Sequence, residues 1–490
     1  TEDDGDFNTA IGHQALTAQT GTSGEVGNTA VGYQAGMDLT TGTVSTFIGY
    51  KAGENKTTAT NNIAIGASAF EGTGTNISNA IAIGYQAMAG NLGDSSAGSG
   101  NVAIGRQALK SATNSSGSVA IGYEAGLYAV HDLYVTAVGY QALQGSGHTG
   151  GSHGTSHYNT ALGYRAGYNY GQCGSADHNV CVGHMAGEYN GPGDRGTFVG
   201  SQAGRFSTIG NDQTFIGAYA GIYSTGSYNT FVGTNAGKGG TTSAPYSSGE
   251  WNVAVGYGAF DSFTTGEENT MIGRSSGHQI TTGDKNTLLG SMAGDGITTG
   301  DANTIIGYAA DVSANSVTKE IVIAASTNAM SGAGTETARI GTHTDYISND
   351  FGENATWTHS SDRRIKIDIK DNTLGLNFIN KLQTRNFKKK APSEYPPEFD
   401  QYDENQTERK NPDKIHYGFV AQEVKEVMDE IGHSEFPVWK ENRDGMQELG
   451  EVEFITPLIK AVQELSSENK ELKDELNELK IFIKKKLGDE

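Results

Sequence analysis

The sequence predicts a mainly β protein, a parallel β-solenoid of about 17 repeats followed by an α+β domain that ends in a coiled coil. Three observations carry this prediction. A pattern of the type NTAVGYQAG, as it stands at 28–36, recurs along residues 8–311. The composition then changes near residues 350–360 from glycine-rich to rich in Lys, Glu, Asp and Leu. Residues 458–487 carry apolar side chains at alternating spacings of four and three.

The repeat is defined by a central glycine, and most copies are 17 residues apart. The glycine follows Ile, Val or Leu in all 17 copies, and Thr, Val or Ile stands three residues before it. Ala stands three residues after it in 16 copies, with Ser276 as the exception. The central glycines are Gly12, Gly32, Gly49, Gly66, Gly84, Gly105, Gly122, Gly139, Gly163, Gly183, Gly200, Gly217, Gly233, Gly256, Gly273, Gly290 and Gly307.

Each copy is expected to begin with a short strand. Side chains alternate between the two faces of a strand, so the residues three and one before the glycine share a face, and β-branched residues suit a buried pleated surface. The residue between them is usually Ala, or Phe at Phe47, Phe198, Phe215 and Phe231, so the opposite face is apolar as well. We therefore expect the β-branched face to be buried, and the Ala/Phe face to need cover from another chain. An Asn opens 11 of the 17 copies and suits a corner.

Coils built from short strands, glycine corners and small alanines are typical of a solenoid, in which each coil buries its surface only against neighbouring coils. Residues 7–325 resemble the head repeats of trimeric autotransporter adhesins and of some phage fibres, in which three parallel β-rolls pack about one axis. The resemblance implies a homotrimer and a trimeric parallel β-solenoid (β-roll) shaft over residues 1–325.

The composition excludes several classes of partner. With 34 Lys+Arg against 56 Asp+Glu, the net charge of −22 disfavours nucleic acid and an anionic membrane surface. Runs of about 18 apolar residues are missing, so no membrane insertion is expected. Cys173 and Cys181 are too few for a disulfide framework, and Cys181 occupies an alanine position of the repeat, where we expect a small buried side chain. The chain begins at Thr1 with neither an initiator methionine nor a signal peptide, so we expect an anchoring segment upstream.

The longer spacings mark insertions at 144–158, 169–178 and 238–251, which we expect to form surface loops that contact a receptor. Aromatic residues in and beside these loops suit stacking on sugars, although isolated exposed aromatics are common on any surface. These aromatic residues are Tyr168, Tyr170, Tyr246 and Trp251.

The first insertion contains His148, His153 and His157, which are candidates for a metal site, above all if three chains supply copies. The alternative is a solvated polar loop, because the spacing matches no standard metal motif and no cysteine or carboxylate accompanies the histidines. We expect no cofactor.

Three ordered motifs follow the shaft: SSDRRIK at 360–366, LGLNFINKL at 374–382 and HYGFVAQEV at 416–424. Together they closely resemble the peptidase S74 family. This family is the intramolecular chaperone at the C-terminus of phage tail spikes and fibres, some bacterial surface proteins and a myelin-gene regulatory factor. The resemblance implies a junction over 326–360 and a self-cleaving chaperone domain over 361–490.

The S-D-x-x-x-K motif of that family maps onto Ser361, Asp362 and Lys366. The resemblance implies a self-cleaving serine peptidase with a Ser/Lys dyad, in which Ser361 attacks the preceding peptide bond and the chain is cut between Ser360 and Ser361. A lysine with a lowered pKa can take the proton of a serine hydroxyl.

Arg363 and Arg364 are suitably placed to lower the pKa of Lys366. Without the resemblance, a Ser and a Lys five residues apart would be weak evidence. In the third motif we expect core packing for every residue except His416, which is a further candidate for supporting the site.

The chain closes on a heptad pattern, which predicts parallel self-association, and a single Asn in such a seam commonly sets register and oligomer state. The seam residues are Leu458, Val462, Leu465, Asn469, Leu472, Leu476, Leu479 and Ile483. A clamp of this kind would bring the chains into register before the slowly folding solenoid assembles.

The leading functional hypothesis is a host-recognition tail fibre or tailspike of a phage, located on the virion tail, that contacts a cell-surface glycan or protein receptor. A bacterial cell-surface adhesin with the same chaperone is the first alternative. A polysaccharide-depolymerising tailspike is the second, although we find no setting of paired carboxylates typical of a glycosidase. The transcription-factor use of the chaperone would need a basic DNA-binding domain, which the acidic repeats do not supply.

Overall fold

The computed structural model describes residues 5–488, apart from residues 21–23, 75, 91–98, 114, 129–133, 146–156, 170–175, 326, 352–353, 360–361, 400, 410–411 and 443. The chain divides into two compact units, Thr1–Ser360 and Ser361–Glu490. The first unit is a parallel β-solenoid, and the second is a smaller unit of helices and two-stranded sheets.

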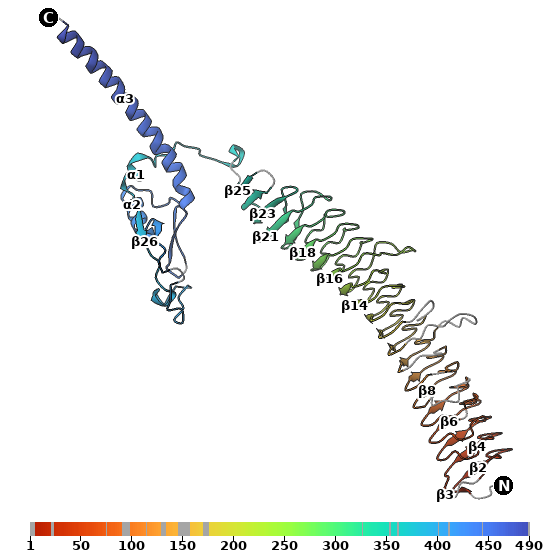
Figure 1. Ribbon diagram of the computed structural model, residues 1–490. Helices are drawn as coiled ribbons and strands as arrows, with labels where there is room; N and C mark the ends of the chain where they lie inside the picture. Colours follow the sequence, from red (N-terminus) through yellow and green to blue (C-terminus); the bar gives the residue numbers. More distant parts are fainter. Residues whose placement is uncertain are drawn as a thin grey trace. The chain divides into compact units, whose positions relative to one another are not determined.

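The solenoid is a row of three-residue strands, each paired in parallel and in register with the strand of the next coil (Figure 1). Thr270, for example, lies opposite Thr287, which lies opposite Thr304. The strands are β2 (Thr9–Ile11), β4 (Thr29–Val31), β5 (Thr46–Ile48), β6 (Ile63–Ile65), β7 (Ile81–Ile83), β8 (Val102–Ile104), β9 (Val119–Ile121), β10 (Thr136–Val138), β11 (Thr160–Leu162), β12 (Val180–Val182), β13 (Thr197–Val199), β14 (Thr214–Ile216), β15 (Thr230–Val232), β16 (Val253–Val255), β17 (Thr270–Ile272), β18 (Thr287–Leu289) and β19 (Thr304–Ile306). The predicted solenoid of about 17 turns is thus confirmed.

Short strands flank this row. β1 (Gly5–Asp6) pairs with β3 (Gly24–Glu25), and β20 (Ala310–Asp311) pairs with β22 (Met330–Ser331). The main sheet continues in parallel through β21 (Ile321–Ala324) and β23 (Thr337–Gly341), and then turns antiparallel through β24 (Tyr346–Asp350) and β25 (Asn354–His359). The regular coil therefore ends in a small meander.

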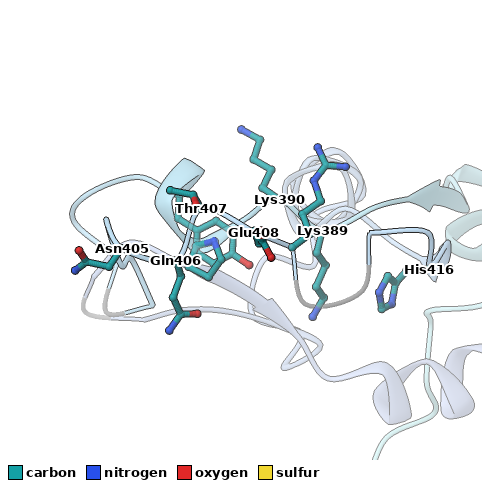
Figure 2. Close-up of a pocket in the computed structure, with 10 residues that line it drawn as sticks. Lys389, Lys390, Asn405, Gln406, Thr407, Glu408 and His416 are labelled. Atoms are coloured by element: carbon teal, nitrogen blue, oxygen red, sulfur yellow. The ribbon is translucent and has the colours of Figure 1, made fainter.

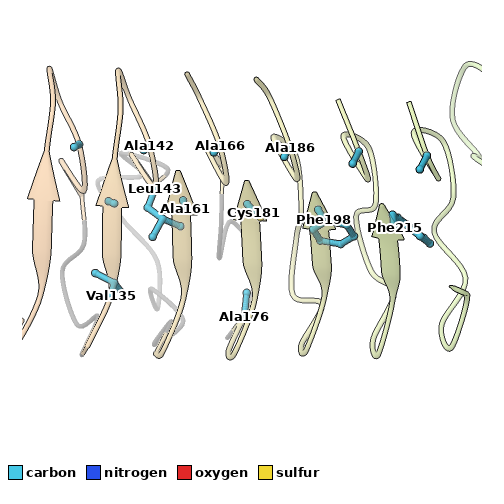
Figure 3. Packing of buried hydrophobic residues seen from close by; sticks show 14 of the residues in the cluster. Val135, Ala142, Leu143, Ala161, Ala166, Ala176, Cys181, Ala186, Phe198 and Phe215 are labelled. Carbon is cyan, nitrogen blue, oxygen red and sulfur yellow. The ribbon is translucent and has the colours of Figure 1, made fainter. Parts of the chain in front are cut away.

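The core of the solenoid is formed by two rows of apolar side chains that face each other across the coil (Figure 3). One row is the central residue of each strand, such as Ala161, Cys181 and Phe198, and the other is the Ala three residues after the glycine, such as Ala166. Cys181 is buried, as expected of its alanine position.

The assignment of the two strand faces was wrong. From β4 to β19 the Ala/Phe face is the one that is buried within a single chain, whereas the β-branched face points outward and is half-buried or exposed. The reason is the small interior volume of the coil. A coil with strands of three residues has space inside for Ala, or for one large side chain opposite a glycine. The β-branched row is therefore the surface that a single chain leaves uncovered.

The central glycine is required by the close approach of the coils. Gly273 has a φ of +137°, and a Cβ atom there would lie 2.2 Å from the carbonyl oxygen of Gly290 in the next coil. A side chain at this position would collide with the backbone, so every copy keeps glycine.

The Asn that opens many copies is buried and bridges successive coils. Asn269 Nδ2 donates to the Gly283 carbonyl at 2.8 Å, and Asn269 Oδ1 accepts from the backbone N–H of Asn286 at 2.9 Å. These side chains satisfy buried backbone groups that the three-residue strands leave unpaired.

Two core positions of each coil exchange bulk. Where the strand carries Phe, as at Phe231, the residue four after the central glycine is Gly, and a Cβ on Gly237 would lie 2.2 Å from the Phe231 ring. Where the strand carries Ala, as at Ala254, that position can hold a large side chain such as the fully buried Phe260. Close packing thus excludes large side chains at both positions of one coil.

The second unit contains α1 (Leu376–Lys381), α2 (Ala421–Glu430) and the 33-residue α3 (Ile455–Leu487), with short 3₁₀ turns at Arg363–Ile365, Pro392–Glu394 and Glu451–Phe454. Two antiparallel pairs of strands join them, β26 (Arg385–Phe387) with β27 (His416–Gly418) and β28 (Trp439–Glu441) with β29 (Gln447–Leu449). The core of this unit is a cluster of six buried side chains, Leu374, Phe378, Val424, Met428, Val438 and Phe454.

Candidate functional site

The SSDRRIK motif begins the second unit with a 3₁₀ turn capped by Asp362. The Asp362 carboxylate accepts from the Arg364 backbone N–H at 2.8 Å and forms an ion pair of 2.6 Å with the Arg364 guanidinium. These hydrogen bonds from Arg364 hold the pKa of the Asp362 carboxyl below its ordinary value. The guanidinium of Arg364 is therefore engaged by Asp362.

Lys366 ends this turn, where its backbone N–H donates to the Arg363 carbonyl at 3.2 Å, and it is exposed. The proposed nucleophile Ser361 and its neighbour Ser360 lie outside the described residues. The dyad of Ser361 and Lys366 thus stays a prediction, as does the cut between Ser360 and Ser361.

The third motif places His416 on β27, half-buried, with its ring stacked at 5.6 Å on Phe387 of β26. His416 also lines a cavity of about 810 Å³, together with Lys389, Lys390 and Glu408 (Figure 2). Neither Asp362 nor Lys366 lines this cavity. The expected supporting role of His416 stays a prediction. The cationic lining of the cavity was not predicted from the sequence, although the run of three lysines at 388–390 indicates it.

On the shaft, the β-branched face forms an apolar stripe along the strands. One member, Leu289, is 47% exposed, and Thr or Val residues line the stripe beside it. The exposed members are Ile11, Ile48, Ile63, Ile65, Ile121, Leu162, Ile216, Ile272 and Leu289. Exposed apolar side chains that recur at the same position of successive coils make this stripe a candidate interaction surface.

A column of aromatic rings runs beside this stripe, formed by the residue that follows the central glycine. Tyr33 stacks on Tyr50 at 5.3 Å, Tyr123 on Tyr140 at 4.9 Å and Tyr140 on Tyr164 at 5.3 Å. This column also went unnoticed in the repeat pattern, although Tyr recurs at that position.

Helix α3 carries the heptad seam on its surface. Only Pro457 and Ala461 of this helix are buried, while Leu472, Leu476 and Leu479 are about half exposed. The Asn469 side chain donates to the Leu465 carbonyl at 2.9 Å within the helix. A coiled coil therefore remains a prediction. The apolar seam of α3 is exposed and could pack against further helices.

The loops expected to contact a receptor lie partly outside the described residues, which include neither His148, His153 nor Tyr170. Tyr246 stacks on Phe206 at 5.4 Å, and Trp251 stacks on Tyr228 at 5.6 Å. One face of each ring is thus covered by another coil.

Among the other expected contacts, Tyr168 lies 3.9 Å beneath the Arg165 guanidinium, and His157 packs edge-on against Tyr158. Within the described part of the chain, no three His, Cys, Asp or Glu side chains are grouped as metal ligands would be. The helices described there are also too short or too polar to cross a bilayer.

Comparison with known proteins gives a family match within the second unit. Residues 361–433 match the Peptidase_S74 family, described as the chaperone of endosialidase, and the β-solenoid of about 17 turns precedes this match. The match begins at the residue where the second compact unit begins. No curated protein and no solved structure matched the chain.

These findings describe a β-solenoid followed by a region, residues 361–433, that is similar to the S74 family of self-cleaving chaperone domains. This arrangement fits proteins of the tail-fibre or tailspike type.

Proposed function

We propose that this protein is a trimeric tail fibre or tailspike of a phage, in which the shaft contacts a receptor on the host surface. Its C-terminal domain, residues 361–490, would drive trimerisation and then be released by one self-cleavage between Ser360 and Ser361. The observation that carries this proposal is the S74 match directly after a solenoid whose outward face is apolar.

The uncovered surfaces support a homotrimer. The apolar stripe of the shaft and the seam of α3 both run lengthwise and are both left exposed by a single chain. Three parallel copies would bury the stripes about one axis, and the α3 helices would join as a parallel bundle through Leu472 and Leu476. The receptor would be a cell-surface glycan or protein, bound by the insertion loops.

The proposed cleavage balances without a cofactor. The neutral Lys366 amine takes the proton of the Ser361 hydroxyl, and the oxygen attacks the Ser360 carbonyl carbon. The new C–O bond replaces the Ser360–Ser361 C–N bond, and the departing nitrogen takes up the proton. Water then hydrolyses the ester, which leaves a carboxylate on Ser360 and a free amino group on Ser361.

The test compares the wild type with Ser361→Ala and with the matched variant Ser360→Ala, by denaturing and native mass spectrometry. We expect wild type and Ser360→Ala to give a fragment that begins at Ser361, and Ser361→Ala to remain intact, with all three trimeric. An intact wild-type trimer would contradict the cleavage and leave the domain as a permanent clamp. A monomeric native mass for all three variants would contradict the trimer.

A further inference from the structure

The segment that carries the proposed base Lys366 has the sequence pattern of a strand but belongs to no strand pair. In IKIDIK, residues 365–370, isoleucine alternates with a charged residue, which is the period-two pattern of a strand with one apolar face. Its apolar side chains are highly exposed, with Ile365 at 66%, Ile367 at 88% and Ile369 at 61%. No strand is formed there, and Asp368 has a φ of 51°, so the segment bends instead.

The same domain contains a sheet with an open edge. β26 and β27 form a sheet of only two strands among the described residues, and two strands alone are marginally stable in water. The outer edge of β27 is flanked by apolar side chains, with Ile415 at 50% and Tyr417 at 76% exposure. Natural proteins usually protect such an edge with charges.

Charge distinguishes the two edges of this sheet. β26 begins at Arg385, which is paired with Glu423 at 2.9 Å, and is followed by three lysines at 388–390 that would repel the lysines of the IKIDIK segment, whereas the single Lys414 precedes β27. Beside β27, in contrast, a Cβ on Gly418 would lie 3.5 Å from Oε1 of Glu451, so a carboxylate stands over the face that a lysine of the added strand would share. The outer edge of β27 is therefore the matching partner.

We propose that residues 365–370 of one copy add as a third strand to β27 of a second copy of this chain. Ile367 and Ile369 would join Ile415 and Tyr417 on one apolar face, and Lys366 would lie on the other face. The second copy is the occupant because the segment makes no strand pair with the described residues of its own chain, and its lysines complement the Glu451 carboxylate beside β27. Asp368 returns to the extended region when the strand pairs.

This docking gives the proposed cleavage a structural requirement. Lys366 lies between two of the isoleucines, so strand addition fixes the backbone that carries the proposed base. That consequence rests on the proposed function, whereas the docking itself does not. A neighbouring copy would then complete the site before the chain is cut.

The test is disulfide trapping in the full chain, carrying Ser361→Ala so that the result does not depend on cleavage, with Cys173→Ser and Cys181→Ala to remove native thiols. The pairs Ile367→Cys with Tyr417→Cys and Ile367→Cys with Ile415→Cys cover two registers on one face. The matched control is Asp368→Cys with Tyr417→Cys, because a shift of one residue turns the side chain to the opposite face. After mild oxidation, the products are weighed by non-reducing denaturing mass spectrometry.

We expect covalent dimers and trimers for at least one Ile367 pair, at least ten times more than for the Asp368 pair. Crosslinks confined to single chains would overturn the second copy as the partner. Equal trapping of both faces, or none in any pair, would overturn the strand addition. Since every variant carries Ser361→Ala, none of these outcomes depends on whether the wild type cleaves itself.

Discussion

The shaft and the C-terminal domain bury their apolar side chains in different ways. In the shaft each coil packs on the next through a continuous core, and its backbone pairs in register from β2 to β21. In the C-terminal domain a cluster of six side chains holds the fold, and most of the 33-residue helix α3 is exposed. A single chain can thus complete most of the shaft, but much less of the domain that follows it.

The two regions also differ in how far apart in the sequence their contacting residues lie. Shaft contacts join residues one coil apart, whereas the C-terminal domain depends on contacts such as the Leu376 N–H with Glu464 at 2.7 Å, which are 88 residues apart. Such contacts close late unless something holds the chain. We therefore expect the domain to be stabilised mainly by association, and the shaft mainly by its own coils.

The largest effect is expected in the α3 seam, where substitutions test whether the C-terminal domain depends on association. Leu472→Glu with Leu476→Glu would place three pairs of like charges inside a trimeric bundle, so we expect loss of the trimer and of soluble shaft. The matched control, Ser467→Glu with Asn477→Glu, adds the same side chains and the same charge outside the seam and is expected to remain trimeric. Light scattering of purified protein measures both. Equal loss of assembly in the two variants would show that the seam has no special role.

The second prediction concerns the core of the shaft. Phe231→Ala removes a fully buried ring beside Gly237, so we expect about 3 to 5 kcal/mol of lost stability. Adding Gly237→Leu should restore part of it, because other coils place a large residue at that position. Gly237→Leu alone should destabilise, because its Cβ would lie 2.2 Å from the ring. Denaturant unfolding of the wild type, the two single variants and the double variant gives the coupling free energy between the two positions. Purely additive changes in stability would contradict the idea that a large side chain at one position requires a small one at the other.

Much of the shaft could be predicted because its information is local and repeated. The glycine, the strand and the alanine recur at fixed spacing, and each has one physical cause that repeats with it. The inward face could not be assigned from the same pattern, because Ala, Thr, Val and Ile are all compatible with a buried strand. The interior volume of the coil decides which face points inward. This volume depends on the distance between two segments of the coil, and the sequence does not show that distance.

The C-terminal site was predictable in a different way. Its residues came from the resemblance of three motifs, and the family match over residues 361–433 confirms that resemblance. The dyad itself stays a prediction. The exposure of Ile367 and the open edge of β27 could not be foreseen, since both depend on which strands find partners within one chain.

The third prediction asks how strictly the shaft core excludes charge. Lys56 is fully buried, donates to the Gly72 carbonyl and lies 4.4 Å from the Phe70 ring centroid. Burial lowers its pKa from 10.5 to about 7. Because the folded pKa is depressed, the folded state is penalised below about pH 10, and the penalty grows until about pH 7.

Lys56→Met should therefore stabilise the shaft by about 2 to 4 kcal/mol at pH 7, and the gain should shrink as the pH rises toward 10. Thermal unfolding over this range is the measurement, with Lys51→Met as control, because Lys51 is partly exposed and paired with Glu54 at 3.1 Å. A gain independent of pH would mean that methionine packing, rather than relief of a buried charge, is responsible.

The smallest expected effect comes from a column of carboxylates on the shaft surface. The Glu267 backbone N–H donates to Asp284 at 2.7 Å, and the Asp284 N–H donates to Asp301 at 2.9 Å, so acidic residues of successive coils stand in line. Partial burial, with Asp284 and Glu250 nearby, raises the pKa of Glu267 above its ordinary value. A raised carboxyl pKa favours the folded state at low pH, and this contribution is lost as the pH rises through the folded pKa.

Glu267→Gln should thus stabilise the shaft slightly at neutral pH, by less than about 0.5 kcal/mol because the group is solvent-screened, and have no effect near pH 3. Glu268→Gln in the adjacent position is the control, and high salt should abolish the difference between the two variants. If Glu267→Gln destabilised the shaft at neutral pH, the carboxylate would be needed as a hydrogen-bonding group, and the column would hold the coils together despite its charge.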